Sequence, residues 1–354
     1  MRVLYFGTYE RNYPRNAQVI SCLREAGVEV VERHASVWEG RRDNWTVRWS
    51  AALRLTLAEA KLWWPRRAAF DAVIVGYPGH FDVPRARRLA GKRPLIFNPL
   101  VSLYDTLVSD RGRFRRGSFA ARVLAVVDRR ALRLPDLVVA DTDANGDFLA
   151  GLADLPRSRV QTCLVGAEER LFHSGWRPEE PFRALFVGKL IPLHGLDVIL
   201  EAARLAPELQ VRVIGSGQLD ELMKEKPSNV EWRDWIEYEQ LPDEYWSAGC
   251  ALGIFSSSEK AARVIPNKAF QALACGTPLI TGDTRGVREL LVDGESALLV
   301  PPGDPAALAA GLRRLAADPG LARRLGAGGR EAYEQQASEE VLGARWRTLI
   351  AELL

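Results

Sequence analysis

Short apolar runs alternate with longer amphipathic segments along almost the whole chain. Short runs rich in Val, Ile and Leu have the length of buried strands, and the segments between them have the length of helices. Strands and helices that alternate in this way form a parallel sheet covered by helices. In the first half of the chain the predicted strands are residues 2–7, 28–33, 72–77, 94–98, 137–141 and 159–165.

The same alternation starts again after a Pro- and Gly-containing stretch at residues 173–181. Here the predicted strands are residues 183–188, 209–215, 229–236, 250–256, 278–282 and 297–302, and helices at 304–317, 319–336 and 338–353 follow them. The pattern predicts an α/β fold with two doubly wound, Rossmann-like domains facing a cleft, and carboxyl-terminal helices that close over the surface. We place the domains at residues 1–175 and 176–336, and we expect the last helix, 337–354, to pack back toward the first domain.

Composition narrows the class of protein. A chain of 354 residues, 47% of them hydrophobic, is long enough for two cores. Because no apolar run approaches the roughly 20 residues that span a bilayer, and the first segment does not have the composition of a signal peptide, we expect a cytoplasmic protein. The four cysteines and four histidines lack disulfide or metal-ligand spacing, so neither a disulfide framework nor a metal site is expected.

Two turns after predicted strands contain glycines but lack the complete G-x-G-x-x-G pattern of dinucleotide sites. In "FGTYERNYPRN" at residues 6–16, Gly7 either lets a diphosphate approach the backbone beside Thr8 or is a turn glycine only. "VIGSGQ" at residues 213–218 begins its turn at Gly215, a candidate ligand-binding glycine, but lacks the third glycine of the dinucleotide pattern. No dinucleotide cofactor is expected.

The stretch "RVIPNKAFQALACGTPLI" at residues 263–280 begins a predicted helix with Pro266, Asn267 and Lys268. A helix start leaves backbone N–H groups without partners and carries partial positive charge, so an anion is its natural occupant. Lys268 adds a full charge. Asn267 is alternatively a helix cap.

Five segments together resemble the carboxyl-terminal, nucleotide-sugar-binding half of the retaining glycosyltransferases of family 4, which have the GT-B fold. They are "FVGKL" (186–190), "HGLDVILEAA" (194–203), "VRVIGSGQ" (211–218), "PNKAFQALACGTPLI" (266–280) and "GVRELLVDGESALLVPPGDPAALA" (286–309). The resemblance implies two Rossmann-like domains, a nucleotide-diphosphate sugar as donor (UDP- or GDP-linked most often), and transfer with retention and without a metal.

The resemblance also implies roles for particular residues. The Arg and Lys that hold the donor diphosphate in the family correspond to Lys189 and His194 here. The two family glutamates that contact the donor sugar and the ribose correspond to Arg263 and Gln271, so this chain departs from the family at both positions. Trp235 and Ile236 fall where the family holds the base, although Trp235 is alternatively a core residue.

Five residues are candidates for the chemistry. Lys189 and Lys268, with Arg263, would stabilise the leaving diphosphate. Glu259, in the loop at 256–268, is the nearest carboxylate for contact with the sugar hydroxyls. Asp105 follows the fourth predicted strand and is expected to orient the acceptor, or to serve only in a turn.

The first half contains two arginine-rich segments. Residues 37–67 combine five Trp with six Arg, and residues 111–133 hold eight Arg and one Asp. This composition suits an anionic membrane surface, a phosphate-rich soluble acceptor or a solvated helix face. Together with the resemblance, it leads us to expect a lipid-linked glycan or a small molecule as the acceptor, with the protein in the cytoplasm or at the inner face of the membrane. No nucleic-acid partner is expected.

Three functions remain open from the sequence. The first is glycosyl transfer. The second is nucleotide-sugar binding without catalysis, which the missing paired glutamates favour, and the third is nucleotide-sugar epimerisation on the same architecture.

Overall fold

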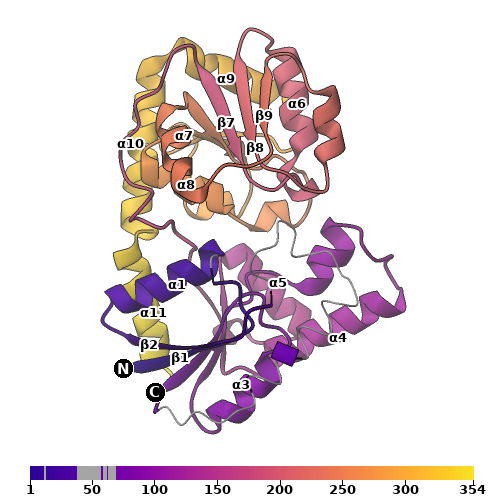
Figure 1. The fold of residues 1–354 in the computed structure, drawn as a ribbon, viewed down its shortest axis with the longest axis vertical. Helices are drawn as coiled ribbons and strands as arrows, with labels where there is room; N and C mark the ends of the chain where they lie inside the picture. Colours follow the sequence, from indigo (N-terminus) through magenta and orange to yellow (C-terminus); the bar gives the residue numbers. More distant parts are fainter. Residues whose placement is uncertain (12, 38–56, 59–61, 63–68) are drawn as a thin grey trace. The chain divides into compact units, whose positions relative to one another are not determined.

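A computed structural model describes residues 1–11, 13–37, 57–58, 62 and 69–354 (Figure 1). The predicted surface segment at 37–67 lies almost entirely outside these residues. The chain divides into two compact units, of which the first comprises Met1–Val165 with Glu339–Leu354, and the second comprises Gly166–Ser338. Each unit contains a six-stranded sheet.

In the first unit all strands are parallel, and their order in the sheet is β2-β1-β3-β4-β5-β6. The chain begins in β1, adds β2 on one side and then crosses to add β3 on the other. The carboxyl ends of β1 and β3 therefore form the topological switch point of this sheet. The strands are β1 (Arg2–Gly7), β2 (Glu29–His34), β3 (Ala72–Val75), β4 (Leu95–Phe97), β5 (Leu137–Ala140) and β6 (Val160–Thr162).

Helices cover both faces of this sheet because its buried side chains alternate between two cores. One core joins Val3 and Ile74 to side chains of α1 and α11, and the other joins Leu4 and Val73 to side chains of α3, α4 and α5. The last helix, α11, packs along α1. The helices are α1 (Pro14–Glu25), α3 (Val83–Ala90), α4 (Phe119–Arg133), α5 (Asp143–Ala153) and α11 (Glu339–Ala351).

The second unit repeats the plan with the parallel order β12-β11-β10-β7-β8-β9. Its switch point lies between β7 and β10. The strands are β7 (Arg183–Val187), β8 (Gln210–Ile214), β9 (Val230–Arg233), β10 (Cys250–Leu252), β11 (Leu279–Gly282) and β12 (Leu298–Val300). The helices are α6 (Leu196–Leu205), α7 (Leu241–Ser247), α8 (Asn267–Cys275), α9 (Pro305–Ala317) and α10 (Pro319–Gln336).

The predicted α/β class with two parallel sheets is confirmed. Several strands end earlier than the apolar runs that predicted them, because the last residues of those runs lie in the turns that follow. The run at 250–256, for example, forms a strand only as far as Leu252. Among the described residues, no helix is both long enough and apolar enough to cross a membrane.

Candidate functional site

The candidate site is built at the switch point of the second unit, where β7 and β10 end side by side. Gly188 and Lys189 follow β7 directly, and the loop after β10 leads to the start of α8. In open parallel sheets, ligands bind outside the carboxyl ends of the strands at such a point. Topology alone therefore brings Lys189 and Lys268 to one edge of the sheet.

Two glycines let the turns after β7 and β8 approach closely. Gly215 has a φ of +137°, and a Cβ atom at this position would lie 2.0 Å from the carbonyl oxygen of Gly188. The Gly188 N–H donates to the Ile214 carbonyl at 2.9 Å. Gly215 was predicted as a ligand-binding glycine, and here it packs against the turn that carries Lys189.

The start of α6 reaches the same edge. A Cβ atom on Gly195 would lie 2.7 Å from the backbone nitrogen of Ser256, which follows β10. The preceding residue, His194, places Nδ1 2.6 Å from the carbonyl oxygen of Lys189. Because a carbonyl oxygen only accepts, Nδ1 carries the proton and fixes the imidazole against the Lys189 turn.

Lys268 extends from the first turn of α8 into this corner. Its side chain is buried, and its Nζ lies 3.7 Å from the centroid of the Phe186 ring in β7 and has no hydrogen-bond partner among the described residues. A Cβ atom on Gly188 would lie 3.0 Å from the same Nζ. Burial lowers the pKa of the Lys268 ammonium well below its usual value.

The start of α8 offers further donors to an anion. The cap position is occupied by Pro266 in an extended conformation, and no side chain caps the first turn. The prediction that Asn267 caps the helix is therefore wrong, because α8 begins at Asn267 itself. An uncapped first turn leaves backbone N–H groups available beside the Lys268 ammonium.

In the loop between β10 and α8, the acidic residue Glu259 and the basic residues differ in exposure to solvent. Glu259 is exposed, whereas Lys260 and Arg263 are 8% and 5% exposed. The short helical turn Ala261–Arg263 packs against Gly286, where a Cβ atom would lie 2.6 Å from the carbonyl carbon of Arg263. Glu259 therefore lies on the solvent side of the loop, and the cationic side chains lie on its inner side.

Gln271 is already engaged by protein partners. Its Oε1 accepts a hydrogen bond from the Tyr245 hydroxyl at 3.1 Å, and its Nε2 donates to the Tyr238 hydroxyl at 3.4 Å. Burial, aided by the nearby Glu168 carboxylate, raises the pKa of Tyr238 to about 12. The position implied to contact a ribose thus also holds α8 to α7 through Tyr245.

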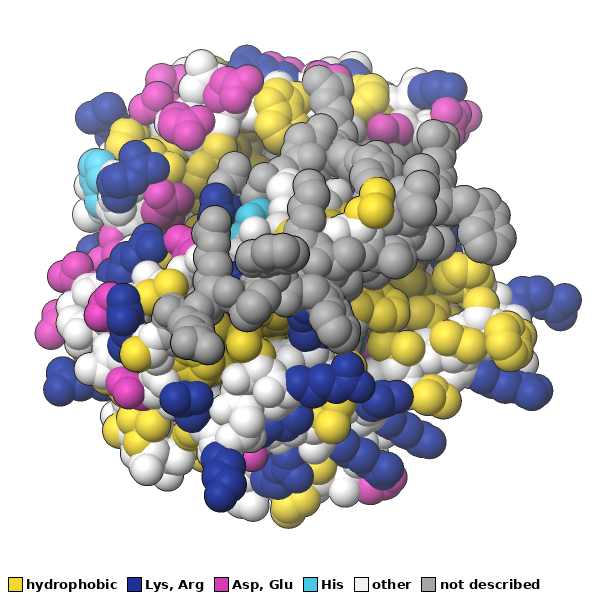
Figure 2. Space-filling view, turned by 60° about the horizontal axis from the view of Figure 1, so that its bottom comes forward, with side chains coloured by type: hydrophobic (Ala, Val, Ile, Leu, Met, Phe, Trp, Pro, Cys, Tyr) yellow, Lys and Arg dark blue, Asp and Glu magenta, His cyan; other side chains and the backbone are white. Residues whose placement is uncertain are grey.

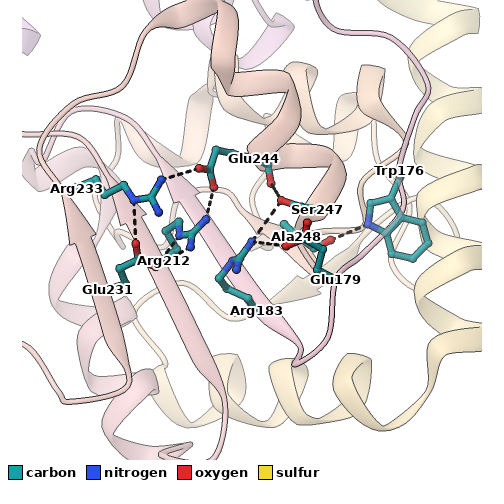
Figure 3. Close-up of polar contacts among 9 residues, drawn as sticks. All are labelled: Trp176, Glu179, Arg183, Arg212, Glu231, Arg233, Glu244, Ser247 and Ala248. Atoms are coloured by element: carbon teal, nitrogen blue, oxygen red, sulfur yellow. Dashed lines mark hydrogen bonds and ion pairs between the residues drawn. The ribbon is translucent and has the colours of Figure 1, made fainter.

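Trp235 is 54% exposed in the loop after β9, so it is not a core residue, and Ile236 beside it is half-buried. An ion-pair network braces the strand end that leads into this loop (Figure 3). Arg233, the last residue of β9, contacts Glu231 at 2.8 Å and Glu244 of α7 at 3.0 Å. Arg212 of β8 joins the same two carboxylates at 2.7 and 2.6 Å.

The same close-up shows how α7 is tied to the segment that opens this unit (Figure 3). The Trp176 indole N–H donates to the carbonyl oxygen of Ala248 at 2.7 Å. Arg183 at the start of β7 donates to the Ser247 hydroxyl at 3.3 Å. The end of α7 is therefore fixed against β7, the strand that leads to Gly188.

In the first unit, Gly7 and Thr8 bind a carboxylate of their own chain. The Thr8 N–H donates to Asp82 Oδ2 at 2.9 Å, and a Cβ atom on Gly7 would lie 2.4 Å from the same oxygen. A negative charge therefore already occupies the place predicted for a diphosphate. This geometry disfavours that assignment, and the glycine is explained by the approach of Asp82.

Asp105 begins a π-helical turn, Asp105–Asp110, after β4, and the segment before it is fixed to α4. Asp128 of α4 accepts hydrogen bonds from the Ser102 hydroxyl at 2.6 Å and from the Tyr104 N–H at 2.9 Å. His80 Nε2 lies 3.3 Å from the same carboxylate. Asp105 is thus half-buried on an anchored turn at the carboxyl edge of the first sheet.

Sequence reasoning missed several residues of the second-unit site. Gly188, Phe186 and Tyr245 were not singled out, although a glycine directly after a buried strand in "FVGKL" was an available signal. The roles of the two aromatic residues depend on tertiary contacts that no spacing reveals. Among the described residues, no cluster of three or more His, Cys, Asp or Glu side chains could hold a metal ion.

Two parallel α/β units, each with a switch point at its carboxyl edge, define the GT-B architecture, and solved structures agree. Sucrose-phosphate synthase of Thermosynechococcus elongatus superposes with a TM-score of 0.77 at 18% identity and covers 99% of this chain and 98% of that one. The Anabaena protein Alr3699/HepE in complex with UDP-glucose superposes with a TM-score of 0.70 at 14% identity over the whole of both chains.

A family model matches most of the second unit. Residues 181–318 match the family model described as "Glycosyl transferases group 1". A D-inositol 3-phosphate glycosyltransferase of Thermomonospora curvata is 32% identical over 229 residues, which are 59% of this chain and 52% of that protein. The chain thus spans about half the length of this relative. Residues 181–318 of the second unit are thus similar to group 1 glycosyl transferases, and the predicted resemblance to glycosyltransferase family 4 is confirmed.

Proposed function

We propose that the protein is a glycosyltransferase that transfers a sugar from a UDP- or GDP-linked donor to an acceptor hydroxyl. The observation that carries the proposal is the buried Lys268 ammonium, which lies beside Gly188 and has no hydrogen-bond partner in the part of the chain that the structure describes. A buried cation is stabilised by an anion, and the uncapped starts of α6 and α8 favour the same charge. The group 1 match and the UDP-glucose complex of a protein similar in fold support a nucleotide-diphosphate sugar as that anion.

In the proposed reaction, the bond between the sugar C1 and the leaving phosphate oxygen breaks, and a bond between C1 and the acceptor oxygen forms. The acceptor proton passes to an oxygen of the leaving phosphate, so the products are a glycosylated acceptor and a nucleoside diphosphate. Lys268 and Lys189, with Arg263, would stabilise the charge that develops on the diphosphate. We propose retention of the anomeric configuration on the basis of the family resemblance. We propose metal independence because these cations can stabilise the charge on the diphosphate.

The proposed donor site also includes further contacts, most of which the resemblance supplies. Trp235 and Ile236 would contact the base, His194 the diphosphate, and Gln271 the ribose. Glu259 would contact sugar hydroxyls. We assign the acceptor to the first unit, where Asp105 would orient its hydroxyl, and the curated relative's name makes a phosphorylated polyol such as inositol 3-phosphate one acceptor to test.

A cytoplasmic location is part of the proposal. All four cysteines are buried and free, and none forms a disulfide in the structure. Free thiols persist in reducing compartments, which favours the cytoplasm.

Donor binding is tested by thermal shift and calorimetry with UDP-, GDP-, ADP- and dTDP-sugars, with and without EDTA. A ligand at 100 times its Kd stabilises the folded state by about 2.7 kcal/mol. We expect one nucleotide to stand out and EDTA to have no effect. Lys268→Met should remove this shift, whereas Lys224→Met, at an exposed position paired with Glu221, should retain it.

Nucleotide-sugar binding without catalysis is the second candidate, and the replacement of the two family glutamates by Arg263 and Gln271 favours it. Turnover separates the two functions. The full chain is incubated with the bound donor and a panel of polyol, glycan and lipid-linked acceptors, and nucleoside diphosphate release and the anomeric configuration of the product are followed by NMR. Binding without release supports the second candidate, and conversion of the donor sugar without any acceptor identifies an epimerase.

A further inference from the structure

Helix α4 exposes an apolar stripe to solvent. Phe119, Val123 and Val126 are 83%, 43% and 64% exposed. Their spacing of four and three residues places them on one face of the helix. Single exposed hydrophobic side chains are normal, but three on one face form an apolar patch, which indicates an interaction site.

The opposite face of α4 packs against the rest of the first unit. Ala121, Ala131 and Leu132 are buried, and the last two belong to the core under the sheet. Asp128 on this buried side holds the segment before Asp105. Because the core contacts are made by other residues, the apolar stripe is not a displaced part of the core.

Arginines border the stripe. Arg115 and Arg116, just before α4, and Arg122 within it are exposed. Between residues 111 and 133 the only acidic residue is Asp128, which is buried. At the right of Figure 2, on the side where Figure 1 places α4, hydrophobic side chains lie beside Lys and Arg side chains. We call Phe119, Val123 and Val126 with Arg115, Arg116 and Arg122 the α4 surface.

We propose that the α4 surface docks the protein on an anionic lipid bilayer. A helix with an apolar stripe and cationic flanks lies in the plane of the interface, with its apolar side chains among the acyl chains and its arginines at the headgroups. A second copy of the chain is a poorer partner, since two such surfaces would bring like charges together. The proposal goes beyond glycosyl transfer and does not rest on it.

The test is sedimentation of the full chain, without donor or acceptor, with vesicles of phosphatidylcholine alone or with one quarter phosphatidylglycerol. We expect binding to the anionic vesicles, weaker binding at high salt, and at least about tenfold weaker binding for Arg115→Glu/Arg116→Glu. Phe119→Ser/Val126→Ser should weaken binding to a similar extent. Arg323→Glu/Arg324→Glu reverses two exposed positive charges on α10 and is the matched control, which should retain binding.

A second measurement reports insertion directly. Because the native cysteines are buried, Val126→Cys offers one accessible thiol for an environment-sensitive NBD label. Its emission should shift to the blue on adding anionic vesicles, whereas a label on Val292→Cys, 52% exposed in the second unit, should not respond.

Three outcomes would overturn the proposal. The first is a folded wild-type protein that does not bind anionic vesicles. The second is equal binding by wild type and Arg115→Glu/Arg116→Glu, with circular dichroism showing both folded. The third is a dimer, or a complex with a single-stranded oligonucleotide, that Phe119→Ser/Val126→Ser abolishes while vesicle binding is unchanged.

Discussion

The Nζ of Lys268 lies 3.7 Å from the centroid of the Phe186 ring, and this aromatic face is the favourable contact that the protein itself provides for the buried cation. A buried ammonium without a hydrogen-bonding partner destabilises the folded state. The folded protein therefore carries a local instability at the point where two helix starts meet. A bound anion would relieve it.

Lys268→Met should raise stability while weakening donor binding. Methionine keeps the length and much of the volume of the lysine stem without the charge. We expect the free energy of unfolding to rise by about 1–4 kcal/mol near neutral pH, and donor binding to weaken by about 1.5–3 kcal/mol. Chemical denaturation and calorimetry measure the two quantities, with Lys224→Met as the exposed control.

The pH dependence of this stabilisation has a definite sign. The pKa of Lys268 is lowered in the folded state, so between that value and the usual 10.5 the unfolded chain binds the proton and the folded chain does not. The free energy of unfolding of the wild type therefore rises relative to that of Lys268→Met as the pH rises through this window. A folded Lys268→Met variant that is less stable than wild type and binds donor normally would contradict the assignment.

Donor binding should also take up a proton. Burial lowers the pKa of Lys268 in the free protein, and a neighbouring diphosphate would raise it again, so a proton is bound along with the donor. Affinity should fall as the pH rises. Calorimetry in PIPES, HEPES and Tris, whose ionisation enthalpies differ, measures the proton uptake directly. The ligand is the nucleotide sugar that the binding panel selects, for example a UDP-sugar.

The His194 imidazole lies in the same corner, so the variants must separate the contributions of the two side chains. Residual donor binding by Lys268→Met should show no linked uptake above pH 7, whereas His194→Gln should retain it. Equal proton uptake by wild type and Lys268→Met would assign the titration to another group.

Gly188→Ala should damage both fold and site. Gly188 has a φ of +143°, and the added Cβ would lie 3.0 Å from Nζ and 3.1 Å from Cε of Lys268. Backbone strain of this kind costs about 1–3 kcal/mol, and displacement of Lys268 adds to it. Gly294→Ala is the matched control, because Gly294 also has a positive φ, +75°, but no atom lies within 4 Å of an added Cβ.

Denaturation should show a larger loss of stability for Gly188→Ala than for Gly294→Ala, and only the first should weaken donor binding. Equal losses with unchanged binding would mean that Gly188 is required for its backbone conformation alone.

The fold could be predicted because its strands are short apolar runs of the right length in a regular alternation with helices. The runs at 72–77 and 183–188 correspond to β3 and β7, and the helix predicted at 319–336 has the bounds of α10. Strand ends were less predictable, since they depend on which backbone approaches the turn. β10 ends at Leu252, and the apolar residues after it belong to the turn against Gly195.

The candidate site could be predicted only in part. Lys268 was predicted from a helix start, which the sequence displays, and Lys189 was predicted from the family resemblance. The approach of Asp82 to Gly7 joins residues far apart in sequence, so no local motif predicts it. The exposure of Trp235 likewise depends on the path of the loop after β9, and the engagement of Gln271 depends on how α7 packs on α8.

Glu244 should matter more to stability than Glu231, although both carboxylates bridge the same two arginines (Figure 3). The Glu244 side chain is 13% exposed and that of Glu231 is 44% exposed. Burial raises the pKa of Glu231, but the Arg212 hydrogen bond and charge outweigh it and leave that pKa lowered. The contribution of Glu231 is therefore present above its usual pKa and is lost as the pH falls through the lowered value.

We expect Glu244→Gln to lower the free energy of unfolding by about 1.5–3 kcal/mol, since it weakens charged hydrogen bonds to the half-buried Arg212. Glu231→Gln should lower it by about 0–1 kcal/mol, as for an exposed pair, and the difference from wild type should vanish in acid. Urea denaturation across pH 3–7 measures both. Because Arg233 leads into the loop that carries Trp235, Glu244→Gln should also weaken donor binding more than Glu231→Gln does. Equal effects of the two variants on stability and binding would show that burial of Glu244 does not govern how the network supports this loop.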